Sequence, residues 1–147
     1  MPNKVMAKAS IGIQKSAIEI YEAIINPQHM TQYFIGSSSG KMEKDKALEW
    51  TFPEFDELCP LTVIDLLPAE KVVFKWDPET IVNITLTKHN DKTTIVKVEE
   101  NGKEMNEVGI KWAIGNTEGW ANFLACLKAY LEYGIRLRVG AFEFMKQ

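Results

Sequence analysis

The residue types that could support catalysis or metal binding are few and widely spaced. The chain of 147 residues has two histidines, His29 and His89, and two cysteines, Cys59 and Cys126. His29 falls in a predicted helical turn and His89 in a predicted hairpin turn, and neither has a cysteine or carboxylate at the spacing of zinc ligands. We expect both histidines at the surface, unbridged reduced cysteines, and no nucleophile–base pair formed by either thiol. No glycine-rich phosphate loop occurs, so neither a metal nor a cofactor is predicted.

Two sets of carboxylates remain as candidates for acid–base chemistry. Glu54, Asp56 and Glu57 lie in the stretch FPEFDELCP between two predicted strands. We expect them to be solvated, because nothing in the pattern isolates them from water. Glu100 closes a predicted strand on the face that carries two valines. Two interpretations of Glu100 stay open: an inward carboxylate at a cavity rim, able to orient a ligand or act as a base, or a strand end that faces water.

Large aromatic side chains give the strongest indication of a binding site. They recur on shared faces of predicted strands and helices, a pattern that plain core packing also produces. Aromatic residues around a curved sheet tend to leave concave apolar space with a few polar groups, which is how small-molecule pockets are built. The predicted ligand-contacting residues are Tyr33, Trp50, Phe52, Phe74, Trp76, Glu100, Trp112, Trp120, Phe123 and Leu127. Seven of them are expected to line one shared interior space: Trp50, Phe52, Phe74, Trp76, Trp120, Phe123 and Leu127.

The positioning elements include an apolar helix near the C-terminus, in the stretch GWANFLACLKAYLEYG. Six of its large side chains fall within an arc of roughly 120° at 100° per residue. Thr117 is predicted as the N-cap, and Gly134 can end the helix in a left-handed conformation. We therefore predict a helix from about Thr117 to Tyr133 whose wide apolar face needs a broad, concave partner surface.

The rest of the chain supplies that surface. Period-two alternation predicts a strand over 5–13, further strands over 47–52, 57–67, 72–76, 80–88 and 93–100, and a short one within 35–46. Two helices are predicted between the strands over 5–13 and 47–52. The first, over 17–25, is capped by Ser16 with Glu19 and presents Ile18, Tyr21, Glu22 and Ile25 in one direction, and the second is begun by Pro27. The predicted class is α+β, with a half-wet antiparallel sheet curved around the last helix.

This arrangement resembles the START-like, helix-grip superfamily, also called SRPBCC, and within it the branch named after the activator of heat-shock protein 90 ATPase. The resemblance rests on the stretches SAIEIYEAIINPQHMTQYF, LLPAEKVVFKW, ITLTKHNDKTTIVKV and GWANFLACLKAYLEYG, whereas KEMNEVGIKWAIGNT departs from the family pattern. The resemblance implies a cavity between the sheet and the long helix, used in various members for lipids, polyketides or other apolar ligands.

Composition narrows the remaining function classes. A net charge of −3 without a Lys/Arg cluster argues against a nucleic-acid partner. No run of roughly 20 apolar residues predicts membrane insertion, and the N-terminus lacks the apolar core of a signal peptide, so a single cytoplasmic domain over 1–147 is expected. The favoured function is non-catalytic binding of a small hydrophobic molecule. The alternatives are a co-chaperone-like interaction domain, with a homodimer or a chaperone as partner, and a cyclase- or hydrolase-type enzyme that uses Glu100 or a tyrosine.

Overall fold

The computed structural model describes residues 3–146 of the chain. Its strands form one seven-stranded antiparallel sheet in the order β1-β7-β6-β5-β4-β3-β2. The strands are β1 (Lys4–Ile13), β2 (Ser37–Ser38), β3 (Ala47–Phe52), β4 (Phe55–Leu67), β5 (Lys71–Asp77), β6 (Thr80–Lys88) and β7 (Thr94–Glu104). The helices are α1 (Ala17–Ile25), α2 (Pro27–Tyr33), α3 (Glu107–Tyr133) and the short 3-10 helix η1 (Glu143–Met145).

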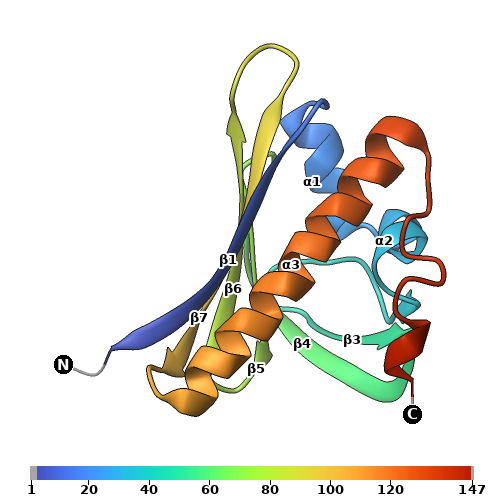
Figure 1. The fold of residues 1–147 in the computed structure, drawn as a ribbon. Helices are drawn as coiled ribbons and strands as arrows, with labels where there is room; N and C mark the ends of the chain where they lie inside the picture. Colours follow the sequence, from blue (N-terminus) through green and yellow to red (C-terminus); the bar gives the residue numbers. More distant parts are fainter. Residues whose placement is uncertain (1–2, 147) are drawn as a thin grey trace.

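The sheet curves around α3, which crosses its inner face diagonally (Figure 1). Alternation within β6 puts apolar side chains on that face, with Val82, Ile84 and Leu86 all buried. The helix buries Trp120, Phe123, Leu124, Cys126 and Leu127 against them. The predicted α+β helix-grip architecture is therefore confirmed.

The long helix begins earlier than the sequence predicted. It starts at Glu107 rather than near Thr117, and its N-cap is Asn106, whose side chain accepts a hydrogen bond from the Gly109 N–H at 2.8 Å. A Cβ at Gly109 would lie 1.9 Å from the Glu104 carbonyl oxygen, so only glycine fits this tight entry. The prediction of the start was wrong because Gly109 and Gly115 lower the helix propensity of this segment, whereas tertiary contacts override that preference. The predicted end at Gly134 is confirmed, with φ 63°.

Helix α1 is buried on more than the side on which the sequence groups Ile18, Tyr21, Glu22 and Ile25. The Ser16 cap is confirmed, since its hydroxyl accepts from the Glu19 N–H at 3.3 Å. Of the grouped residues, Tyr21 and Ile25 are buried but Ile18 is 48% exposed, and Ile20 and Ile24 are buried as well. The helix packs against α2 as well as against β5 and β6, so its covered side is turned away from Ile18.

Two charged side chains fix the C-terminal half of α3 to the end of β1. The Lys128 ammonium donates to the Gly12 carbonyl at 2.7 Å, and the Glu132 carboxylate accepts from the Gln14 N–H at 2.8 Å. Burial acts to raise the pKa of Glu132, but the hydrogen bonds from Lys128 and Gln14 and the Lys128 charge outweigh it and leave that pKa below its usual value. The helix is thus anchored at the end opposite to the candidate site.

Candidate functional site

Glu100 lies on the inner face of β7 and is completely buried. In the sheet it is paired with Val82 of β6 on one side and Ala7 of β1 on the other. The strand continues to Glu104, so Glu100 does not end it. Of the two interpretations left open by the sequence, the water-facing one is wrong and the inward one is correct in orientation.

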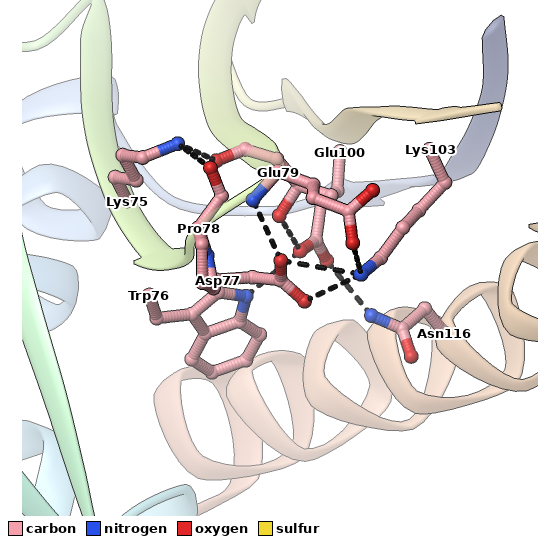
Figure 2. A network of polar contacts seen from close by, with 9 residues as sticks. Lys75, Trp76, Asp77, Pro78, Glu79, Glu100, Lys103 and Asn116 are labelled. Carbon is pink, nitrogen blue, oxygen red and sulfur yellow. Dashed lines mark hydrogen bonds and ion pairs between the residues drawn. The ribbon is translucent and has the colours of Figure 1, made fainter.

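The Glu100 carboxylate accepts four hydrogen bonds. One oxygen accepts from the Trp76 indole at 2.8 Å and the Thr80 hydroxyl at 2.7 Å. The other accepts from the Asn116 amide at 2.9 Å and the Trp120 indole at 3.0 Å. Figure 2 shows Glu100 together with Trp76 and Asn116. A carboxylate has about four acceptor positions, so all of them are used in holding β5, β6 and α3 together.

A second charged cluster closes the same end of the sheet (Figure 2). The Lys103 ammonium lies 3.1 Å from the Asp77 carboxylate and 3.0 Å from that of Glu79. The hydrogen bond to Glu79 is the main reason that the pKa of Lys103 is raised. Lys103 also lies over the Trp112 ring, 5.9 Å from its centroid. Gly102 of β7, with φ 134°, lets the β5–β6 turn that carries Glu79 pack closely against β7. A Cβ at Gly102 would lie 1.9 Å from the Glu79 carbonyl oxygen.

A pocket of about 330 Å³ opens beside this network. One wall is the middle of α3, the second is the β3–β4 hairpin, and the third is the C-terminal tail, which runs down beside these strands in Figure 1. Met145 of the tail contributes to the lining. The aromatic part of the lining consists of Phe34, Phe52, Phe55, Trp76, Trp120 and Phe142. The pocket is therefore predominantly aromatic and apolar, the usual character of a small-molecule site.

Two glycines of α3 keep the pocket open. Gly115 and Gly119 both line it, and a Cβ added at either position would meet no side chain or other neighbouring part of residues 3–146. Neither has positive φ. A glycine inside a helix costs about 0.5–1 kcal/mol relative to alanine. Since no close approach within the chain explains this cost, the structural effect of the missing side chains is the space that they leave in the pocket.

The tail brings a cation to the pocket and pairs it with a buried carboxylate. Nη2 of Arg138 lies 2.9 Å from Oε1 of Glu54, and the side chains are 16% and 5% exposed. The guanidinium also lies over the Phe142 ring, 4.7 Å from its centroid. The prediction that Glu54 is solvated is therefore wrong, because its partner comes from a distant part of the chain, whereas Asp56 and Glu57 are exposed as predicted.

The predicted ligand-contacting residues separate into three groups. Phe52, Trp76 and Trp120 form the first group and line the pocket. Glu100, which accepts from the Trp76 and Trp120 indoles, and Trp112, which is half-buried against Lys103, form the second group, in the polar network beside it. The other five pack together in the adjoining core: Tyr33, Trp50, Phe74, Phe123 and Leu127. Their roles in ligand binding stay predictions. The sequence offered one signal for the residues it missed, the four-residue spacing of Gly115 and Gly119, and none for Arg138, Phe142 or Met145.

The residues first considered for metal or thiol chemistry are placed differently from one another. His89 is exposed as predicted, but His29 is half-buried, with Nδ1 2.7 Å from the Tyr130 hydroxyl, so its predicted surface position is wrong. Cys59 and Cys126 are unbridged, as predicted. Burial raises the pKa of both thiols, which disfavours the nucleophilic thiolate.

Residues 3–146 contain neither a metal-binding cluster nor a helix that could span a membrane. Within residues 3–146, no three His, Cys, Asp or Glu side chains gather in a way that could hold a metal ion. The helices in the same range include none with the length and apolar character needed to cross a bilayer.

The chain is similar to proteins of known sequence family and structure. Residues 15–132 match the family model of the activator of Hsp90 ATPase homolog 1-like proteins. No curated protein matches the chain significantly.

Solved structures with the same fold are similar to it over most of its length. A Staphylococcus saprophyticus protein is 24% identical with a TM-score of 0.80, over 91% of this chain and 96% of that one. A protein of the dynemicin biosynthetic locus is 22% identical with a TM-score of 0.79, over 89% of this chain and 48% of that one. The Aha1 dimer from Colwellia psychrerythraea is 21% identical with a TM-score of 0.72, over 88% and 98%.

Proposed function

The chain belongs to the family of activator of Hsp90 ATPase homolog 1-like proteins, and from this premise and the pocket we propose that it binds a small hydrophobic molecule without transforming it. The observation that carries the proposal is the pair of α3 glycines, Gly115 and Gly119, beside an aromatic pocket of about 330 Å³. A helix that forgoes two side chains where nothing crowds them loses stability and retains an open site. That volume lies at the lower end of the range for small-molecule pockets.

The side chains that could act as a base or nucleophile, Glu100, Cys59 and Cys126, favour binding without catalysis. All four acceptor positions of the Glu100 carboxylate are taken by side chains of the protein, which leaves none for a ligand proton. The thiols of Cys59 and Cys126 have raised pKa values because they are buried. A buried carboxylate that orients Trp76 and Trp120 fits a rigid binding site better than a base.

Filling the pocket from α3 tests the proposal. We expect the wild-type protein to bind an uncharged fluorescent probe, phenylnaphthylamine, saturably, and Gly119→Leu to weaken this binding by about tenfold or more, equivalent to at least about 1.4 kcal/mol. The fold should persist, because a Cβ at Gly119 meets no obstacle and leucine is the better helix former. Probe titration and thermal unfolding measure the two effects.

Ala121→Leu is the matched control for this substitution. Ala121 is exposed on α3 and does not line the pocket, so the added side chain should leave probe affinity unchanged. The proposal fails if the wild-type protein shows no saturable binding, or if Gly119→Leu binds the probe as well as Ala121→Leu does.

Self-association is a second candidate, favoured by the first half of α3. Ile110 and Ile114, one turn apart, are 47% and 68% exposed, an unusual position for two isoleucines. The related structure from Colwellia psychrerythraea is described as a dimer. We expect sedimentation of the wild-type protein to show a species with the mass of two chains at high concentration, and Ile114→Lys to abolish it. Val139→Lys, at a 71% exposed position in the tail, is the control, and an unchanged mass distribution for Ile114→Lys would exclude this surface.

A further inference from the structure

We infer that the ligand of this pocket is an uncharged, flat molecule that presents an oxygen acceptor, such as a ketone, quinone, ester or amide carbonyl, to Arg138. The inference rests on the proposed function and narrows it to one chemical class. It follows from three features: a donor that is left over, a cation that already has its counter-ion, and rings that are held rigid.

The donor that is left over belongs to the Arg138 guanidinium. This group has five N–H donors and no acceptor. Its Nη2 is used by Glu54, but its Nε is buried and has no hydrogen-bond partner within residues 3–146. The buried Nε is out of reach of a ligand in the pocket, but Arg138 lines the pocket and Glu54 takes a hydrogen bond from Nη2 alone. A ligand oxygen in the pocket can therefore accept from a guanidinium N–H that Glu54 does not use. The guanidinium lies over the rings of Phe34, Phe52 and Phe142, which restrict its orientation before any ligand arrives.

The cation in the pocket lining already has a counter-ion. Glu54 is 5% exposed and neutralises Arg138 directly. The other ionisable residue in the lining is Glu118, which is also acidic. A ligand carboxylate would therefore meet two carboxylates and one cation, in a lining that is otherwise mostly aromatic. A cationic ligand would be placed beside Arg138. A neutral carbonyl oxygen accepts from the free N–H without adding a charge.

The rings of the pocket are held in fixed orientations. Trp76 and Trp120 stack on each other, with centroids 5.1 Å apart and planes 27° apart. Both indole N–H groups are hydrogen-bonded to Glu100, so neither ring can turn freely. Phe34 and Phe52 meet edge to face across 5.4 Å. Rigid aromatic surfaces favour a flat ring system over a flexible chain, because little side-chain freedom is lost when such a ligand binds.

Three probes of similar shape separate the ligand classes: methyl naphthyl ketone, ethylnaphthalene and naphthoate. We expect the wild-type protein, titrated calorimetrically at about pH 8, where the naphthoate is ionised, to bind the ketone more tightly than the naphthoate. In Glu54→Gln/Arg138→Met, which removes both charges together, the ratio of ketone to ethylnaphthalene affinity should fall about tenfold, because the donor is gone. Taking this ratio cancels the different hydration of the two probes.

A single substitution should reverse the preference. Glu54→Gln leaves the Arg138 charge without its partner, so the ratio of naphthoate to ketone affinity should rise about tenfold. Asp56→Asn removes the same charge from an exposed position in the same hairpin and should leave the ratio unchanged. Circular dichroism establishes that each variant is folded, and if Glu54→Gln is not, the wild-type order of the three probes decides.

The outcomes distinguish the inference from the proposed function. Tighter binding of naphthoate than of the ketone by the wild-type protein, or an unchanged ketone-to-ethylnaphthalene ratio in the folded double variant, overturns the inference and leaves hydrophobic binding intact. If none of the three probes and no phenylnaphthylamine binds, the proposed function and the inference fall together.

Discussion

Replacing Glu100 with leucine is expected to lower the free energy of unfolding by about 2–6 kcal/mol. The substitution removes the shared acceptor of four donors, of which the Thr80 hydroxyl and the Trp120 indole N–H are in fully buried contacts. Each buried donor left without a partner costs about 1–3 kcal/mol, and the sum of two gives the range. Urea denaturation monitored by circular dichroism measures the change.

The same variant should also weaken probe binding, because Trp76 and Trp120 lose the contact that fixes their rings in the pocket wall. Glu99→Gln is the control: Glu99 is the preceding residue on the opposite face of β7, where it pairs with Lys97, and its loss should change stability by at most about 0.5 kcal/mol. Equal stability of Glu100→Leu and the wild-type protein would show that apolar packing replaces the network, and would remove its assigned role.

Phe123→Ala is expected to destabilise the protein by about 3–5 kcal/mol, the usual cost of truncating a buried phenylalanine. Phe123 of α3 is 1% exposed and packs against the C-terminal end of α2. Its ring centroid lies 4.7 Å from that of Phe34, 5.8 Å from that of Tyr33 and 5.4 Å from that of Trp120. Since Phe123 does not line the pocket, the loss is one of packing. Equilibrium denaturation of the purified variant checks the value.

Phe144→Ala provides the same chemical change at a position that is 78% exposed. It should alter stability by at most about 0.5 kcal/mol. A cost below about 1 kcal/mol for Phe123→Ala, or equal costs for the two variants, would contradict the assignment of Phe123 to the core.

The strands were predictable where they keep period-two alternation. Strands β3 and β6 have the predicted bounds, since buried residues in them alternate with residues that are not buried. Helix α1 was predicted in extent, but the burial of Ile20 and Ile24 was not, because the helix is covered from two sides, by α2 and by the sheet. The start of α3 was hidden by Gly109 and Gly115, which local propensity counts against a helix.

The candidate site was predictable only where it coincides with regular alternation. Phe52, Trp76 and Trp120 were found because they lie on strand and helix faces that point inward. The pairing of Glu54 with Arg138 joins residues 84 positions apart, and no local pattern announces it. The tail has no repeating pattern at all, so its contribution to the pocket could not be inferred from the sequence.

Helix α3 separates packing from ligand recognition along its length. Its second half carries the buried stripe with Phe123, Leu124 and Leu127 and is tied to β1, whereas its middle presents Gly115 and Gly119 to open space. Changes at the glycines alter the size of the pocket without touching the packed stripe. Substitutions between Gly115 and Gly119 can thus change which ligands fit the pocket while the packed side chains of the second half stay in place. The same scaffold is in this sense evolvable: its recognition surface can drift between ligands at little cost to stability.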